Sequence, residues 1–328
     1  MTTSALDALI PGDLIARAAE YLRSVLRPTP CQYSPGLSQL LGRQVWLKWE
    51  LIQPTRSFKV RGALFAVHEL ARSAANRDAA LVTASTGNHG LGLAFAASQA
   101  GRTAYVYVPQ GANPAKVEAM RTLGAEIRVA GSDWQEAFEH ATAVCARDGL
   151  PYVHSFEDPN IVAGQATIGT ELAADGPDAH TVLVPIGGGG LIAGVARGLA
   201  AAGVGARVIG VEPAGADRMR RSLEAGKVVR IPPFTTIADG LAARAPGELT
   251  FGVTKALVDR VVTVEETAIR EAMAAVFRAE RLPVEPSSAT TIAALATHDA
   301  GVIPGERVVC LMTGGNVDPA LLREVVGQ

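Results

Sequence analysis

The chain has few cysteines and no cysteine motif. Cys31, Cys145 and Cys310 are scattered along the sequence and form no CxxC pair. This pattern argues against a disulfide framework and against a cysteine-based metal cluster. The six histidines, His89 and His154 among them, show no ligand spacing, so we expect no bound metal. Unpaired thiols are typical of a reducing compartment, and we expect a cytoplasmic protein.

Neither sign of charge dominates, because 30 basic residues are balanced by 32 acidic ones and the net charge is -2. No basic run stands out, which argues against nucleic acid or an anionic membrane as a partner. The longest uncharged run, 181–196, is too short and too rich in glycine to span a bilayer. The first seven residues lack the basic and apolar parts of a signal peptide. We therefore expect a soluble intracellular protein.

The hydrophobic pattern predicts an α/β protein. Hydrophobic residues make up 48% of the 328 residues, enough for a large core or two smaller ones. Apolar runs of strand length alternate with helical stretches, which predicts parallel sheets covered by helices. The first such series is strand 81–84, helix 88–100, strand 104–108, helix 115–123, strand 126–129 and helix 134–147. We expect this continuous series to form a small lobe, residues 79–155.

A second series begins after His154. Its predicted strands are 181–186, 207–211 and 308–312, and a helix at 191–202 follows the first of them. We assign the first part of the chain to this later series. The sequence thus predicts two open parallel α/β lobes, a large one of residues 1–78 and 156–328 and a small one of residues 79–155.

The segment 54–63, Pro-Thr-Arg-Ser-Phe-Lys-Val-Arg-Gly-Ala, places Lys59 at the start of a predicted helix. The positive end of the helix dipole disfavours a charged amine, and partial burial lowers its pKa further. A neutral amine is the form that Schiff-base chemistry on a carbonyl requires. Most lysines are solvated surface charges, so this motif needs the support of others.

Four consecutive glycines end the predicted strand 181–186 and open a helix. Without Cβ atoms, their backbone N–H groups can converge on an anion at the helix N-terminus. A flexible linker is excluded by the periodic apolar segments on both sides. A dinucleotide-binding unit remains an alternative, because Glu212 follows Gly190 by 22 residues, but Ile192 stands where the third fingerprint glycine belongs. The run consists of Gly187, Gly188, Gly189 and Gly190.

Two further polar segments follow predicted strands. The loop 85–90, Ser-Thr-Gly-Asn-His-Gly, precedes a helix, so its amides can face an anion, although Ser85 or Asn88 could equally be a simple helix cap. Thr313 ends the last strand, where open α/β sheets bind ligands. It could also be an ordinary turn residue before two glycines.

In this order and spacing, the four motifs resemble the fold type II (tryptophan synthase β-like) pyridoxal-phosphate enzymes, in particular the serine/threonine dehydratase and serine racemase branch. The resemblance runs from Thr29 to Asp318. It implies that pyridoxal 5'-phosphate lies between the lobes, bound covalently by Lys59 with Phe58 beside it, and that the glycine run holds its phosphate. It also implies that Asn88 contacts the ring hydroxyl and Thr313 the pyridine nitrogen. The implied substrate-carboxylate loop consists of Ser85, Thr86, Gly87, Asn88 and His89.

The resemblance implies β-elimination from a small 3-hydroxy amino acid, L-threonine or L-serine, to a 2-oxo acid and ammonia, by a homodimer. Lys59 and Thr86 are the implied catalytic residues. Alternatives are a serine racemase, a threonine synthase whose related loop also reads Ser-Thr-Gly-Asn, and a non-enzymatic cofactor-binding relative. Phe156 is a candidate for the side-chain pocket, although a buried core aromatic is the default.

Three positions depart from the family pattern. Arg56 replaces the usual glycine before Ser-Phe-Lys, and Thr86 replaces the racemase serine, which puts efficient racemisation in doubt. Arg218 stands six residues after Glu212, where racemases have a second carboxylate for a divalent ion. We expect the guanidinium to pair with Glu212 in place of Mg²⁺ or Ca²⁺. No C-terminal regulatory module follows Asp318, so we expect no feedback by isoleucine.

Overall fold

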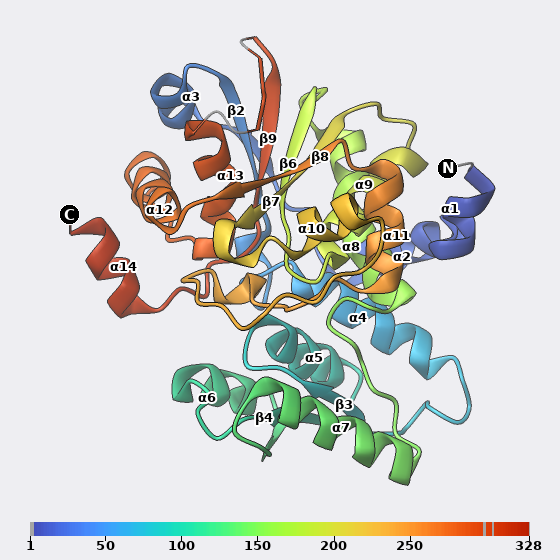
Figure 1. Ribbon diagram of the computed structural model, residues 1–328. Coiled ribbons are helices and arrows are strands. Elements are labelled where there is room, and N and C mark those ends of the chain that lie inside the picture. The colour runs from blue at the N-terminus through green and yellow to red at the C-terminus, as the bar shows by residue number, and fades with distance from the viewer. Residues whose placement is uncertain (1–2, 298–299, 304, 328) are drawn as a thin grey trace.

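The computed structural model describes residues 3–297, 300–303 and 305–327. They form two separate sheets, each packed against helices (Figure 1). The larger sheet has the strand order β1-β2-β9-β6-β7-β8, in which only the β1–β2 pairing is antiparallel. The smaller has the order β3-β4-β5 and is wholly parallel. The predicted parallel α/β architecture is confirmed.

The larger sheet draws its strands from both ends of the chain. The two N-terminal strands join it because β2 pairs in parallel with β9, with Val45 opposite Val308 and Leu47 opposite Cys310. The strands are β1 (Cys31–Tyr33), β2 (Gln44–Trp49), β6 (Thr181–Pro185), β7 (Arg207–Pro213), β8 (Arg260–Val264) and β9 (Arg307–Met312).

Helices cover both faces of the larger sheet (Figure 1). One face is covered by α3 (Pro35–Leu41), α12 (Glu266–Glu280) and α13 (Pro286–Ala296), and α14 (Pro319–Val326) packs on α12. The other side carries α1 (Thr3–Leu9), α2 (Gly12–Val25), α8 (Pro159–Asp175), α9 (Gly190–Ala201), α10 (Arg218–Ala225) and α11 (Glu248–Leu257).

The burial of alternate residues of β9 explains why helices cover both faces of the larger sheet. Val308, Cys310 and Met312 are buried in a cluster with residues of α12 and α13. Val309 and Leu311 are buried in a second cluster with residues of α8 and α9. Because successive strand residues point to opposite faces, an almost wholly apolar strand must be covered on both sides.

The smaller sheet is built from one continuous segment, seen at the bottom of Figure 1. It contains β3 (Leu81–Ala84), α5 (Asn88–Gln99), β4 (Ala104–Val108), α6 (Pro114–Thr122), β5 (Glu126–Val129) and α7 (Trp134–Asp148). Its three strands have the bounds expected from the sequence. The helix α4 (Lys59–Ala71) packs against both α5 and α8, so it lies where the two sheet systems meet. Three short 3-10 turns, η1 (Glu50–Ile52), η2 (Ala214–Ala216) and η3 (Asp239–Leu241), complete the described elements.

No helix in the described ranges is both long enough and apolar enough to cross a membrane.

Candidate active site

Lys59 is the first residue of α4 and lies against the loop that follows β9. The backbone N–H of Phe58 donates to the carbonyl of Thr313 at 3.0 Å, and Ser57 forms a β-bridge with Gly314. The Lys59 amine donates to the carbonyl of Ser155 at 2.9 Å. Burial lowers the pKa of Lys59 from 10.5 to about 8, so a large share of the amine is neutral at a mildly alkaline pH.

Arg56 keeps the path of this loop although it is not a glycine. Its φ of 56° lies in the left-handed region that glycine adopts without strain. Its N–H donates to Gln53 at 2.7 Å and its carbonyl accepts from Gly315 at 2.9 Å. Arg56 therefore takes a backbone conformation that glycine adopts freely, and its backbone hydrogen bonds hold the loop before Lys59.

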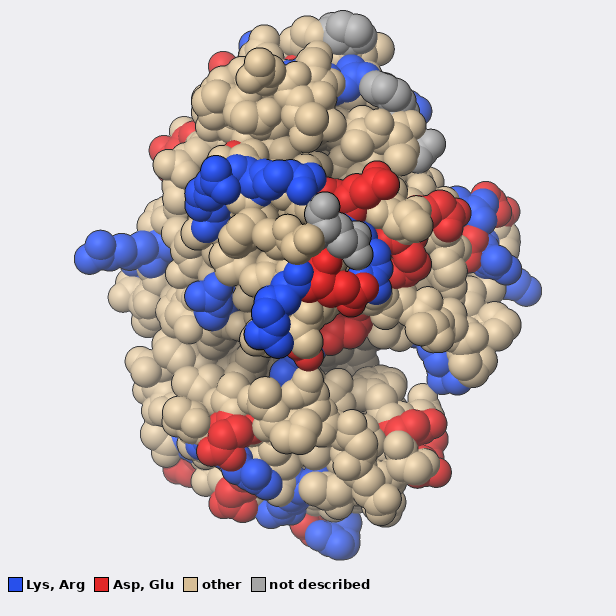
Figure 2. All heavy atoms as spheres, turned by 90° about the vertical axis from the view of Figure 1, so that its left-hand side faces the viewer, with Lys and Arg blue, Asp and Glu red and all other residues tan. Residues whose placement is uncertain are grey.

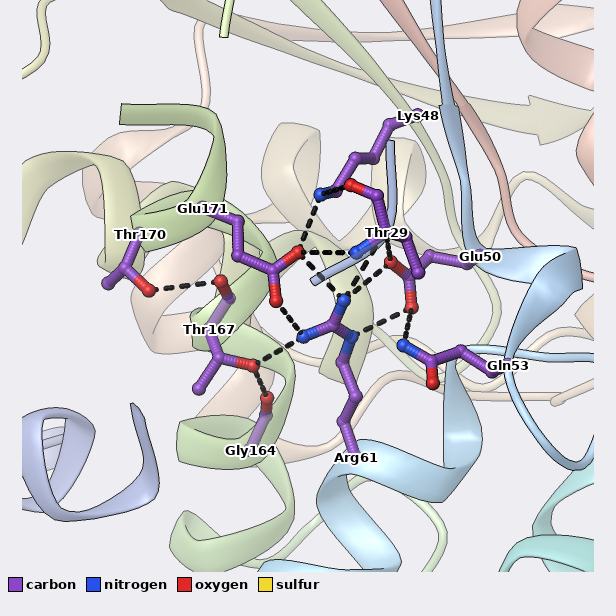
Figure 3. Close-up of polar contacts among 9 residues, drawn as sticks. All are labelled: Thr29, Lys48, Glu50, Gln53, Arg61, Gly164, Thr167, Thr170 and Glu171. Carbon is purple, nitrogen blue, oxygen red and sulfur yellow. Dashed lines mark hydrogen bonds and ion pairs between the residues drawn. The ribbon is translucent and has the colours of Figure 1, made fainter. Parts of the chain in front are cut away.

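A buried ionic network holds Arg61, which lies in the same first turn of α4 as Lys59 (Figure 3). The Arg61 guanidinium lies between two carboxylates, 2.8 Å from Glu50 and 2.6 Å from Glu171. Lys48 pairs with Glu171 at 2.5 Å and donates to the carbonyl of Thr29 at 2.6 Å. Two cations and two carboxylates thus join β2, η1, α4 and α8, which makes the base of α4 a rigid support.

The glycine run connects β6 to α9, and its N–H groups are free. Among the described residues, none of the backbone N–H groups of 187–190 donates a hydrogen bond. Gly189 has a φ of 95°, and a Cβ on Gly188 would come within 2.3 Å of the Phe156 ring. Glycine is therefore required at both positions. The unused donors lie at the positive end of a 12-residue helix, which suits an anion such as phosphate.

Phe156 connects the glycine run to Lys59. Its ring packs on Gly188, while the preceding residue, Ser155, accepts the hydrogen bond from the Lys59 amine. The two motifs, 128 residues apart in sequence, therefore contact the same short segment. His154 anchors that segment, because its Nδ1 accepts from the backbone N–H groups of Phe156 at 3.2 Å and Glu157 at 2.8 Å.

The loop 85–90 lies between β3 and α5. Ser85 acts as a local cap, since its Oγ accepts from Gly90 at 3.0 Å and from Gly87 at 3.3 Å. Thr86 and Gly87 are partly exposed. His89 is buried, which lowers its pKa to about 3, so the ring is neutral. Its Nε2 lies 3.0 Å from the Val153 carbonyl and must carry the proton, because a carbonyl only accepts.

Asn88 contacts a carboxylate that the sequence did not single out. Its Nδ2 donates to the two oxygens of Glu285 at 2.9 and 3.0 Å, and its Oδ1 accepts from Asn316 at 2.8 Å. Glu285 also accepts from the backbone N–H of Asn316 at 2.9 Å. Burial raises the pKa of Glu285, although the hydrogen bonds from Asn88 and Asn316 oppose this shift.

A cavity of about 340 Å³ opens beside this group. Asn113 and Lys116 of the smaller sheet system line one side of it, and Asp239, Glu285 and Asn316 line the other. The space-filling view shows the molecule hollowed between its upper and lower parts on this face (Figure 2). Lys116 forms an ion pair with Asp239 across this opening. The cavity therefore opens between the two sheet systems, beside Glu285 and Asn316, the two partners of Asn88.

Thr313 is buried at the end of β9 and contacts Ser288, another residue that sequence reasoning missed. Their hydroxyl oxygens are 3.0 Å apart, and Ser288 also accepts from the N–H of Gly314 at 3.0 Å. Glu285 and Ser288 both belong to the start of α13, at Glu-Pro-Ser-Ser. The available signal was an acidic residue and two hydroxyls at the N-terminus of an otherwise apolar helix.

Arg218 and Glu212 are both fully buried, with the Arg218 Nε 3.6 Å from Glu212 Oε1. Glu212 accepts from the N–H groups of Met219 and Arg220, each at 3.0 Å. Burial raises the pKa of Glu212 to about 7, against the lowering effect of Arg218. A carboxylate held in this way has no access to a ribose, which is a physical argument against the dinucleotide-binding alternative. Within the described residues, no group of three His, Cys, Asp or Glu side chains could hold a metal.

Comparison with known proteins agrees with this geometry. A family model described as "Pyridoxal-phosphate dependent enzyme" matches residues 22–314. The L-threonine ammonia-lyase of Geobacter sulfurreducens is 40% identical over 318 residues, which cover 97% of this chain and 78% of that protein. The serine racemase of Arabidopsis thaliana is 36% identical over 308 residues, which cover 93% and 92%.

Among solved structures, the processed form of threonine deaminase isoform 2 from Solanum lycopersicum superposes with a TM-score of 0.92. It is 35% identical, and the match covers 100% of this chain and 89% of that one. The relatives and the motifs therefore agree over nearly the whole sequence. The chain belongs to the family of pyridoxal-phosphate dependent enzymes and has their type II fold.

Proposed function

We propose that the protein is an ammonia-lyase that converts a small 3-hydroxy amino acid, L-threonine before L-serine, to a 2-oxo acid and ammonia. The observation that carries the proposal is the pairing of a partly buried lysine amine with free backbone donors. The Lys59 amine contacts Ser155, and the glycine run, whose N–H groups are unused, packs against the next residue, Phe156. A reactive amine and an anion site that share one short segment fit an aldehyde that carries a phosphate.

Other residues of the cleft also fit pyridoxal 5'-phosphate. Lys59 would hold the aldehyde carbon, residues 187–190 the phosphate, Asn88 the ring hydroxyl and Thr313 the ring nitrogen, with Phe58 beside the ring. The bound cofactor would supply an electron sink for the negative charge that develops at Cα of the amino acid. A hydroxyl at the ring nitrogen makes a weaker sink than a carboxylate does, which favours elimination of a β-leaving group.

The chain's own residues would bind the substrate and move its protons. The loop of Ser85, Thr86, Gly87, Asn88 and His89 would hold the substrate carboxylate. The neutral Lys59 amine would accept the Cα proton at Nζ, and its lowered pKa makes that form available. Loss of the β-hydroxyl as water leaves an enamine, which hydrolyses to the 2-oxo acid and ammonia. L-threonine is named first because two of the compared relatives bear its name.

Oxo-acid formation from a panel of 3-hydroxy amino acids tests the proposal. We expect turnover of L-threonine and L-serine by the wild type and none by Lys59→Ala. Rapid exchange of L- and D-serine with no oxo acid would instead indicate a serine racemase, the second candidate, which the Arabidopsis relative supports. A requirement for a phosphorylated homoserine would indicate a threonine synthase. An inert wild type that still binds the cofactor would indicate a binding protein.

The same family resemblance supports a homodimer, and the three free thiols support a reducing, cytoplasmic location. Light scattering on the purified protein tests the first, and fractionation of the source cells tests the second.

A further inference from the structure

The carbonyl groups of the glycine run are held by a buried arginine. Arg218 is 0% exposed, and its guanidinium faces the turn between β6 and α9. Its Nε and Nη2 donate to the Gly187 carbonyl at 3.1 and 3.0 Å. The same Nη2 donates to the Ile186 carbonyl, and Nη1 donates to the Ala216 carbonyl. One side chain therefore fixes the first carbonyl of the run and the carbonyl just before it, and ties them to η2.

The next carbonyl is held by α11. The buried Thr250 hydroxyl donates to the Gly188 carbonyl at 2.7 Å, and the N–H of Gly247 approaches the same oxygen at 3.3 Å. Thr250 also lies where a side chain on Gly189 would be, with its Oγ1 2.7 Å from the position of a Cβ. Arg218 and Thr250 thus hold three successive carbonyls, those of residues 186, 187 and 188.

Peptide geometry determines the direction in which the N–H groups of the glycine run point. No peptide bond among the described residues is cis. In a planar trans peptide the N–H points opposite to the C=O of the preceding residue. Because the carbonyls of 186 and 187 point to Arg218 and that of 188 points to Thr250, the N–H groups of Gly187, Gly188 and Gly189 point away from these side chains. Those are three of the donors that have no acceptor among the described residues.

We propose that Arg218 and Thr250 are positioning residues that hold the carbonyls of the glycine run so that its N–H groups converge on the phosphate of the cofactor. This inference rests on the proposed function, since it assigns a phosphate to the run. Neither side chain touches the anion. Glu212 lies 3.6 Å from the guanidinium and is itself held by the first turn of α10.

The test compares two ligands that differ only in the phosphate, pyridoxal 5'-phosphate and pyridoxal, titrated into apo-protein by absorbance and fluorescence. Thr250→Val keeps the side-chain shape but removes the donor, and we expect about tenfold weaker binding of pyridoxal 5'-phosphate. Binding of pyridoxal should stay within about twofold of the wild type. Arg218→Lys should show the same selective loss to a larger degree, because an ammonium cannot reach all three carbonyls.

The matched control is Thr254→Val, one turn further along α11. Its hydroxyl is buried and has no hydrogen-bond partner among the described residues, so its removal should change neither affinity. Thr250→Ser, which keeps a hydroxyl, should restore wild-type selectivity for the phosphate. If Arg218→Lys does not fold, Thr250→Val alone decides the question.

If the variants lose affinity equally for both ligands, or lose affinity for neither, the inference is overturned. The proposed function would not be affected by that result. A wild-type protein that binds pyridoxal 5'-phosphate no better than pyridoxal would overturn the phosphate assignment and this inference together.

Discussion

Asn88 and Glu285 form a hydrogen-bonded pair across the cleft, with the Asn88 amide 2.9 and 3.0 Å from the two carboxylate oxygens. Asn88 begins α5 beside the smaller sheet, whereas Glu285 precedes α13 on the larger one. The pair therefore links the two sheet systems at the proposed site.

Removing this carboxylate should impair catalysis more than stability. Glu285→Ala leaves Asn88 and the N–H of Asn316 without their acceptor, and a hydrogen bond to a charged group contributes about 1.5–3 kcal/mol. We expect kcat/KM for L-threonine to fall by roughly 10- to 100-fold. Glu285→Gln keeps one carbonyl acceptor, so its kcat/KM should fall less than that of Glu285→Ala. Equal kcat/KM for both variants and the wild type would show that the pair does not support the site.

Lys59 should react with a pH dependence unlike that of an ordinary amine. Only the neutral amine is nucleophilic, and burial lowers the pKa of Lys59 to about 8. The rate of its reductive methylation in apo-protein should therefore rise as the pH increases towards 8 and level off above it. Mass spectrometry of the peptide that contains Lys59 would measure this rate. A midpoint near the ordinary value of 10.5 would contradict the buried amine.

The network around Arg61 should contribute strongly to stability. Arg61→Met leaves Glu50 and Glu171 without their shared cation, and Glu50 is 0% exposed. Removal of one partner from a buried ion pair costs about 3–5 kcal/mol, to be measured by urea unfolding. Arg270→Met is the control, because Arg270 and its partner Glu324 are 32% and 56% exposed. This variant should lose no more than about 1 kcal/mol.

Acid should weaken the same network. Burial raises the pKa of Glu50, but the charge and hydrogen bonds of Arg61 outweigh this effect and leave the pKa lowered. A carboxyl group whose folded-state pKa is lowered contributes stability above its unfolded pKa of about 4.3 and loses it as the pH falls through the folded value. The difference in unfolding free energy between the wild type and Arg61→Met should therefore shrink in acid. A constant difference from pH 7 to pH 3 would argue against this linkage.

Activity should not depend on divalent ions. Arg218 is a fixed cation beside Glu212, where a metal would need a second carboxylate. Dialysis against EDTA should leave kcat/KM nearly unchanged, and neither Mg²⁺ nor Ca²⁺ should raise it. A several-fold loss that either ion restores would show that Glu212 binds a metal in spite of Arg218. Arg218→Asp is the converse variant and should create cation binding.

The sequence predicts those parts of the site that lie in a recognisable short pattern beside a strand or a helix. The glycine run follows β6 of the larger sheet and the loop 85–90 follows β3 of the smaller one, each just before a helix, and Lys59 begins a helix. The order of elements alone therefore predicts that the two loops lie at the ligand-binding ends of their strands. Glu285, Ser288 and Thr250 do not follow a strand in this way. They reach the site through packing of α13 and α11, which depends on contacts distant in sequence.

Strand β2 was missed for a related reason. Its sequence, Gln-Val-Trp-Leu-Lys-Trp, contains a lysine that reads as exposed. In the structure Lys48 is 2% exposed because Glu171, from α8, neutralises it. A buried charge can be recognised only when its partner is known, and here the partner lies 123 residues away.

The strand order also determines when the larger sheet can be completed during synthesis of the chain. Within the described part of the chain, strand β2 pairs with β1 on one edge and on the other with β9, whose last residue is Met312. Until that residue leaves the ribosome, one edge of β2 has no neighbour, although the segment of β3, β4 and β5 is already whole. An open edge on a nascent chain invites pairing with other chains. The long delay between the two strands thus leaves an unpaired edge of β2 open for most of the synthesis of the chain.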